Sequence, residues 1–394
     1  MICSTNTNTA LFFSSIDEIP SQIWDQLNCS KNIYFHPSFL KSIEKNHSEI
    51  NFSYIVLVDN NNIPTAFASI QIINFYVNSI KNDLEFLKKI GRKLHVFPDK
   101  KPLKLLICGN TFVSGEHGVY IKENQDKKAI LKELAESIHH FVNSDKNLKI
   151  DAFLIKDFIN ESLFITDELK KFNYHPFSVE PNMVLKIDEN WQNFDDYLAA
   201  IKTKFRVKAK KAFKQSINIK IEEVSAVNLA NQLPEMTKLY KTVASNAGFN
   251  LGNFNLETYK DLKEKLGENY VLKTYWLNNK MVGFISGVIN KNSLDAHFVG
   301  IDYQLNREYA IYQRMLYDYI ETAISKGLNK INFGRTASEI KSSVGAVPQD
   351  LTMYLRHKKS IKNKILKLFL QRIQPTPFQQ KFPFKTIKNL HEKQ

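Results

Sequence analysis

The second half of the chain carries an ordered succession of apolar patterns that few folds can accommodate. Three strand-like stretches follow one another with short turns between them: residues 270–277, 281–289 and 293–301. The first turn contains Asn278 and Asn279, and Asn tolerates the positive φ that a tight hairpin needs. A helical pattern over residues 307–326 then leads through Gly327 to a final strand at 330–333. This order of strands and helices predicts an α/β fold.

The first half of the chain repeats this order more roughly, with a helical pattern between its own strand-like stretches. A chain of 394 residues is also longer than one hydrophobic core normally serves. We therefore expect two tandem domains, residues 1–182 and 183–360, followed by a basic helical tail at 361–394.

Composition places the chain among ordinary globular proteins, with 43% apolar and 24% charged residues. The three cysteines share no metal-ligand spacing and indicate reduced thiols of a cytoplasmic protein. The histidines also lack a zinc spacing, so no metal is expected. No stretch is long and apolar enough to predict a membrane span, and the N-terminus does not resemble a signal peptide.

The net charge of +14 is concentrated in two segments. Residues 202–214 hold seven Lys or Arg, residues 351–391 hold ten, and neither segment contains an acid. Such blocks favour an anionic partner, either a phosphate-bearing cofactor, tRNA or an anionic lipid surface, over a merely solvated basic face. No DNA-reading motif is present, so DNA is not expected as a partner.

The tail contains a short amphipathic pattern over residues 361–373, IKNKILKLFLQRI. Its apolar side chains fall on one side of a helix: Ile361, Ile365, Leu368 and Phe369. A basic amphipathic helix of this kind can lie in a membrane interface, which is the interpretation we favour. The alternative is a helix that packs on its own domain.

Two stretches of sequence resemble the Fem-type and acetyltransferase-like proteins. The first is the basic stretch 191–213, which we expect to form one long helix. The second is 293–346, with its motifs Gly300-Ile301-Asp302, Asn332-Phe333-Gly334-Arg335, and Lys341 followed by Gly345. This resemblance implies two tandem GNAT-like acyl-CoA N-acyltransferase domains, each with a mixed sheet whose central parallel strands splay to admit an acyl donor.

The resemblance implies an N-acyltransferase that uses acyl-CoA or an acyl-carrier thioester. Its acceptor would be an amine on a lipid or cell-envelope precursor, and the enzyme would be cytoplasmic and peripheral at the inner face of the membrane. One alternative is a Fem-type aminoacyltransferase that uses aminoacyl-tRNA on a peptidoglycan precursor; another is a non-catalytic membrane-binding scaffold. Residues 303–309 contain no glycine where CoA enzymes of this superfamily usually hold the pyrophosphate on a Gly-rich turn.

Lys341 and Arg335 are the cationic candidates for the site. Lys341 matches a lysine-bearing loop that would offset charge on the donor or on the oxyanion, unless it is a helix-surface lysine. Gly334 and Arg335 lie at a strand end where ligands of open sheets gather. A guanidinium there can clamp phosphate or carboxylate, although an ion pair with Asp302 would give it a structural role instead.

His297 is the first candidate for the general base that deprotonates the amine, unless it is simply packed. Asp302 and Glu339 are rival bases. Tyr309 and Tyr312 either line the acyl cleft or belong to the core. Arg206 and Lys210 of the basic helix are candidates for binding donor phosphates; these side chains complete the predicted substrate- and cofactor-binding set.

Overall fold

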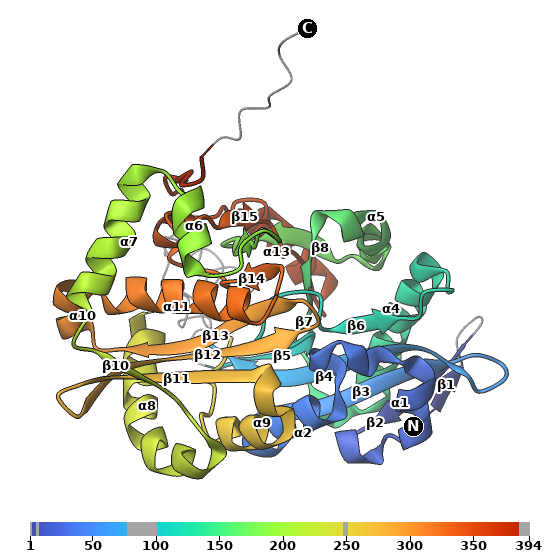
Figure 1. Cartoon of the computed structure of the whole chain (residues 1–394). Helices are drawn as coiled ribbons and strands as arrows, with labels where there is room; N and C mark the ends of the chain where they lie inside the picture. The colour runs from blue at the N-terminus through green and yellow to red at the C-terminus, as the bar shows by residue number, and fades with distance from the viewer. Residues whose placement is uncertain (1, 5–7, 77–100, 247–250, 386–394) are drawn as a thin grey trace, which may run out of the picture. The chain divides into compact units, whose positions relative to one another are not determined.

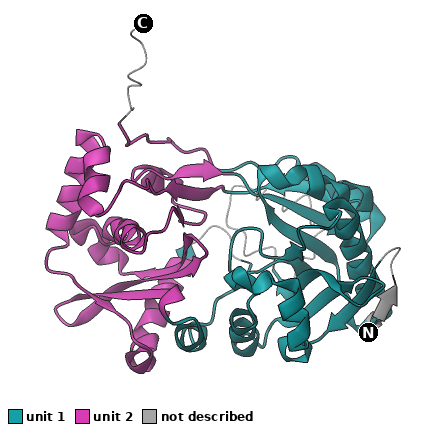
Figure 2. Ribbon diagram, turned by 45° about the vertical axis from the view of Figure 1, so that its right-hand side comes forward, with its two compact units in different colours: residues 1–180, 246–267, 350–375 teal, residues 181–245, 268–349, 376–394 magenta. Residues whose placement is uncertain are grey.

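The computed structural model describes residues 2–4, 8–76, 101–246 and 251–385, and the chain forms two compact units. Unit 1 comprises residues 1–180, 246–267 and 350–375, and unit 2 comprises 181–245, 268–349 and 376–394 (Figure 2). The compact units differ from the predicted domains, because residues 246–267 and 350–375 group with unit 1. The last nine residues of the predicted tail lie outside the described residues.

Unit 1 is built on a nine-stranded sheet. Its strands are β1 (Ile2–Ser4), β2 (Thr9–Phe13), β3 (Asn51–Val58), β4 (Pro64–Phe75), β5 (Leu103–Cys108), β6 (Val119–Ile121), β7 (Ala152–Phe158), β8 (His175–Ser178) and β16 (Thr352–His357). They lie in the order β1-β2-β3-β4-β5-β7-β16-β8, with β6 paired to β4. Strands β5 and β7 are parallel, whereas β16 is antiparallel to both β7 and β8.

The helices of unit 1 come from three separate stretches of the chain. They are α1 (Ser21–Leu27), α2 (Pro37–Asn46), α4 (Lys127–Ser144), α5 (Leu163–Thr166), α9 (Thr258–Leu266) and α13 (Ser360–Leu370). Helix α4 packs its apolar face, which includes Ile130, Leu134 and Ile138, into the core of the unit. Helix α9 is fixed on α2 because Asp261 accepts a hydrogen bond from Asn46 Nδ2 over 2.7 Å.

Unit 2 is built on a seven-stranded sheet in the order β10-β11-β12-β13-β14-β9-β15. Its strands are β9 (Asn182–Lys186), β10 (Lys220–Glu223), β11 (Tyr270–Leu277), β12 (Lys280–Asn290), β13 (Ser293–Ile301), β14 (Lys330–Asn332) and β15 (Val347–Gln349). Its helices are α6 (Phe194–Ala200), α7 (Thr203–Gln215), α8 (Ala226–Asn246), α10 (Tyr303–Tyr309), α11 (Ile311–Ser325) and α12 (Ser338–Ser342). The predicted mixed sheets flanked by helices are confirmed.

Helix α11 is the crossover between the parallel strands β13 and β14 of unit 2 (Figure 1). Leu294 of β13 shares one apolar cluster with Ile311, Met315 and Ile320 of α11. The edge-to-face contact of Phe298 with Tyr240 packs β13 against α8. Helices α11 and α8 therefore hold β13 in place near the point where β13 and β14 separate.

Two predicted helices are each interrupted. The pattern at 191–213 forms α6 and α7, because Ile201 is extended and bridges Phe384, while the Lys202 N–H donates to Pro383 O over 2.8 Å. The pattern at 307–326 is broken at Ala310, whose φ of +49° lies in the left-handed region. The prediction that each of these two stretches forms one continuous helix is therefore wrong.

Candidate functional site

The parallel strands β13 and β14 of unit 2 form a fork. They pair only through Ser293–Asp295 of β13 and Lys330–Asn332 of β14. Strand β13 continues to Ile301, whereas the chain after β14 follows β9, with the Phe333 N–H donating to Met183 O over 2.8 Å. Ligands of open sheets bind outside the carboxyl ends of strands, so this fork is the candidate site.

A β-bulge deforms β13 at the fork. The register passes from Ile285 opposite Val299 to Gly287 opposite Ala296, so that Ser286 faces two residues. One of them is His297, which is half-buried and lies with its ring 4.3 Å from that of Phe298, centroid to centroid. Bulges re-aim side chains and are frequent beside active sites. The structure therefore places the predicted base at the fork.

The acid Asp295 marks the last paired position of β13 in the fork. It is 8% exposed, its Oδ1 accepts from Ser293 Oγ over 3.2 Å, and the same oxygen contacts Asn332 Nδ2 across the strand pair. Sequence reasoning missed this carboxylate. An acid inside a predicted strand was the available signal, since a buried carboxylate needs polar partners.

The turn that follows β14 has a left-handed backbone at three positions: Gly334 (φ +74°), Thr336 (φ +66°) and Ala337 (φ +49°). Glycine adopts this conformation at little cost, but a β-branched threonine does so only under constraint. Such strained residues are concentrated at functional sites and need surrounding structure to hold them. Arg335 therefore lies inside a strained turn at the edge of the fork.

Lys341 of α12 supports this turn through hydrogen bonds to its main-chain carbonyls. Its Nζ donates to Gly334 O over 3.2 Å and to Arg335 O over 2.7 Å, and the residue is only 4% exposed. Burial lowers the pKa of the amine to about 7. The helix-surface alternative is thus wrong, and the amine faces the main chain of the turn.

Asp302 caps α10 instead of facing the fork. Its carboxylate accepts from the Gln304 and Leu305 amides and forms an ion pair with Lys280 over 2.8 Å. Burial alone would raise the pKa of Asp302, but Lys280 and the two amides hold it below its usual range. The acid that we considered for an ion pair with Arg335 therefore pairs with Lys280.

The beginning of α11 is held by side chains of the protein itself. The Tyr312 N–H donates to Asn306 Oδ1 over 2.8 Å, directly after the left-handed Ala310. Tyr309 and Tyr312 both pack against the core of unit 2, as the core alternative predicted, and burial raises the pKa of Tyr312. Helix α10 thus occupies the place of the expected phosphate-binding turn.

The remaining predicted residues lie on α7 and α12. Helix α7 buries Ala209 and Ala212, and its side chain Arg206 contacts Thr203 Oγ1 over 3.3 Å. Lys210 is one of its exposed lysines, together with Lys204, Lys208, Lys211 and Lys214. Glu339, on α12, forms an ion pair with Lys381 over 3.1 Å.

In unit 1, the end of the parallel strand pair β5 and β7, which corresponds to the fork of unit 2, is filled by the side chain of a lysine. Strands β5 and β7 pair in parallel up to Cys108 and Ile155. The next residue of β7, Lys156, is buried and donates to Asn110 O over 2.7 Å and to Val113 O over 2.8 Å. A Cβ on Gly109 would lie 2.5 Å from its Cγ. The side chain therefore packs into the end of this strand pair.

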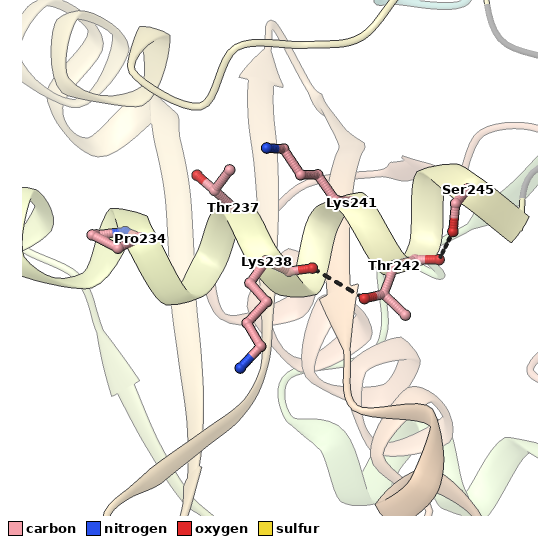
Figure 3. A pocket seen from close by; sticks show the side chains of 6 residues that line it. All are labelled: Pro234, Thr237, Lys238, Lys241, Thr242 and Ser245. Carbon is pink, nitrogen blue, oxygen red and sulfur yellow. Dashed lines mark hydrogen bonds between the residues drawn. The ribbon is translucent and has the colours of Figure 1, made fainter.

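A shallow hollow of about 510 Å³ runs along one side of α8 (Figure 3). Six residues of that helix line it: Pro234, Thr237, Lys238, Lys241, Thr242 and Ser245. Leu239 and Tyr240, which contact β13, point to the other side of α8. The hollow is therefore separate from the fork. Within the described residues, no cluster of possible metal ligands and no helix able to span a membrane is found.

Comparison with known proteins places this geometry in context. The family model FemAB-like, described as peptidoglycan biosynthesis/recognition, matches residues 105–383. The solved structure of FemX superposes with a TM-score of 0.51 at 12% identity, covering 84% of this chain and 93% of FemX. A tandem GNAT protein from the clavulanic acid biosynthesis pathway gives 0.52 at 6% identity, covering 88% of this chain and 98% of that one. Both likenesses concern the fold alone, and no curated protein matches the sequence.

Proposed function

The chain belongs to the FemAB-like family, and from this membership we propose that it is an N-acyltransferase that joins an activated acyl group to an amine. The tandem GNAT fold is an acyltransferase fold. The observation that best supports the proposal is the fork of β13 and β14, with a bulge on one side and a strained turn held by Lys341 on the other.

In the proposed reaction the amine nitrogen attacks the carbonyl carbon of the acyl donor directly. The new C–N bond forms, the bond from the carbonyl carbon to the leaving sulfur or oxygen breaks, and that atom departs with the electron pair. The amine proton passes to a base and then to the leaving group. Within the described residues, the thiols of Cys29 and Cys108 are unsuited to covalent catalysis, since burial raises the pKa of each to about 12.

The residues of the fork suggest a role for each participant. His297, at the bulge, would accept the amine proton. Alternate N–H groups of β13 beyond Asp295 face away from β12 and could donate to the oxyanion. Arg335 would neutralise charge on the donor or the adduct. Lys341 would act as a positioning residue, because its amine is engaged with the turn.

The donor would be a thioester of CoA or of an acyl carrier, held by contacts other than a pyrophosphate at α11. A pyrophosphate at a helix N-terminus needs free amides. In this chain the amide of Tyr312 is already bound to Asn306. The side-chain hydrogen bond therefore favours a donor that is recognised through its acyl and thioester portion.

The acceptor would be an amine on a lipid or cell-envelope precursor, met at the inner face of the membrane. The family description, peptidoglycan biosynthesis/recognition, supports an envelope precursor. The alternative donor is aminoacyl-tRNA, and the exposed lysines of α7 favour it specifically, because a row of cations can follow a phosphate backbone.

The proposal can be tested by direct product analysis. The purified chain is incubated with acyl-CoA, an acylated carrier protein or aminoacyl-tRNA, each with a mixture of amine-bearing envelope lipids and precursors. Mass spectrometry then searches for the amide product, with heat-inactivated protein as the control. An amide from a thioester would support the first donor, and one from aminoacyl-tRNA would support the alternative. Absence of any amide with all three donors would contradict the enzymatic proposal.

A further inference from the structure

Helix α13 has two apolar sides that face different surroundings. One side packs on β8 and β16 of unit 1 and buries Leu366, Phe369 and Leu370. The other side exposes Ile361 (77%) and Leu368 (60%), which lie seven residues apart on one stripe of the helix. The apolar face expected from the sequence is thus divided, since Phe369 packs inward while Ile361 and Leu368 point to solvent.

The inward side is fixed by hydrogen bonds as well as by apolar contacts. Asn363 is buried, its Nδ2 donates to Asn173 O over 2.8 Å, and its Oδ1 accepts from the His357 N–H over 2.8 Å. Because this side is anchored to the unit, the outward stripe keeps a constant orientation. A rigid amphipathic surface loses less conformational entropy on docking than a free peptide does.

Cations surround the exposed apolar stripe. Lys364 neighbours Ile361 and Leu368 around the helix, and Lys367 lies beyond Lys364. Arg372 follows in the turn after the helix ends, and all three cations are exposed. Lys358 and Lys359 precede the helix and are also exposed. The sequence has no Asp or Glu between residues 351 and 391. The face therefore combines apolar side chains with uniform positive charge.

We propose that the outward face of α13 together with the turn that follows it, defined by Ile361, Lys364, Lys367, Leu368 and Arg372, is a docking surface for an anionic lipid bilayer. Apolar side chains in the centre and cations beside them are the arrangement that an acyl-chain boundary with anionic headgroups complements. The helix is about 16 Å long at 1.5 Å per residue, enough to contact several headgroups at once. Nucleic acid would engage the cations but leave Ile361 and Leu368 without an apolar partner.

The docking surface complements the proposed function, because it would hold the chain at the membrane in which the proposed acceptor resides. It does not depend on catalysis, since vesicle binding is measured without donor or acceptor. Transfer to a water-soluble amine, by contrast, needs the fork and no bilayer. Failure of the docking surface and failure of the proposed transfer are thus observed in separate experiments.

The test is co-sedimentation of the full chain with vesicles of phosphatidylcholine, with and without phosphatidylglycerol, at several salt concentrations. We expect binding only to the anionic vesicles and a loss of binding as salt rises. The triple variant Lys364→Gln, Lys367→Gln, Arg372→Gln should bind about 100-fold more weakly, from about 1 kcal/mol per cation. The double variant Ile361→Asn, Leu368→Asn should lose roughly tenfold for each side chain.

Matched controls separate this face from general basicity. Lys204→Gln, Lys208→Gln, Lys211→Gln removes the same charge from α7, and Ile217→Asn, Val227→Asn replaces two exposed apolar side chains of unit 2. Both controls should bind vesicles as the unchanged protein does. The proposal is overturned if the protein ignores anionic vesicles at low salt, or if the α7 control weakens binding as much as the α13 variant. Binding of RNA that is lost with the α13 cations, with no vesicle binding, would also overturn it.

Discussion

The Nζ of Lys341 donates a hydrogen bond to the main-chain carbonyl of Arg335, six residues earlier, over 2.7 Å. A second bond to Gly334 O, over 3.2 Å, makes the lysine a brace for the strained turn beside the fork. The sequence predicted that Lys341 would face the donor or the oxyanion, but its amine contacts the main chain of Gly334 and Arg335. Its contribution to the reaction would therefore be geometric.

Lys341→Met should lower kcat by about 100-fold, because releasing the turn displaces Arg335 from the acyl group. KM should change far less, since the variant removes no group that contacts the donor. Steady-state kinetics with a soluble amine would measure both values. Lys186→Met, an exposed lysine of β9, is the matched control and should leave them unchanged. Equal losses in kcat and in folded protein would show that the brace serves stability alone.

The stability of the protein should increase between about pH 7 and pH 10 through Lys341. Burial lowers the pKa of its amine in the folded state to about 7, whereas the unfolded amine holds its proton to about 10.4. The unfolded state thus binds more protons in this window, and the free energy of unfolding rises with pH. Urea unfolding of the protein and of Lys341→Met should diverge across this range. A constant difference between the two would contradict the lowered pKa.

Lys156→Met should destabilise unit 1 strongly. Lys156 pairs with Asp157 over 2.6 Å, and the carboxylate of Asp157 is completely buried. Removing the cation leaves that buried charge without its ionic partner, which costs about 3–5 kcal/mol. Chemical denaturation of the variant would measure the loss. Recovery of stability in the double variant Lys156→Met, Asp157→Asn is expected, and its absence would point to packing rather than charge.

His297→Gln should lower kcat by roughly 100-fold, because glutamine cannot accept the amine proton that the imidazole would take. KM should change far less, since the variant keeps a polar side chain of similar size at the bulge. Steady-state kinetics with a soluble amine would measure both values. An unchanged kcat would assign the base to another group.

Asp302→Ala should cost about 1 kcal/mol of stability while transfer continues at a similar rate. The side chain caps α10 through two amides, and loss of an N-cap has this typical effect. Thermal unfolding and the transfer assay would be compared on one preparation. A fall in kcat comparable to that of His297→Gln would return Asp302 to the list of bases.

Local patterns foretold the parts of the fold that depend on neighbouring residues. The turn residues Asn278 and Asn279 both have positive φ, as a tight hairpin requires, and Asn62 does so in the first half of the chain. In the strands that flank these turns, apolar residues either alternate with polar ones or form a continuous run. This pattern indicates which faces of each strand are buried. The α/β class and the tandem fold followed from this order and from the resemblance.

Distant partners explain what the sequence could not reveal. The break between α6 and α7 arises at Ile201, which bridges Phe384 far along the chain. Lys156 reads as an ordinary lysine in a strand until the carbonyls of Asn110 and Val113 surround its amine. The contact of Asp295 with Asn332 depends on the pairing of β13 with β14, which the sequence does not show.

The placement of β16 between β7 and β8 constrains how the chain is made. Residues 352–357 are synthesised long after residues 152–158 and 175–178, so the sheet of unit 1 lacks one of its strands while residues 179–351 are being made. During that time the edges of β7 and β8 that will pair with β16 have main-chain N–H and C=O groups without a strand partner. A nascent chain halted near residue 300 would present these edges to chaperones or to other copies, which makes the late strand the closing step of biogenesis.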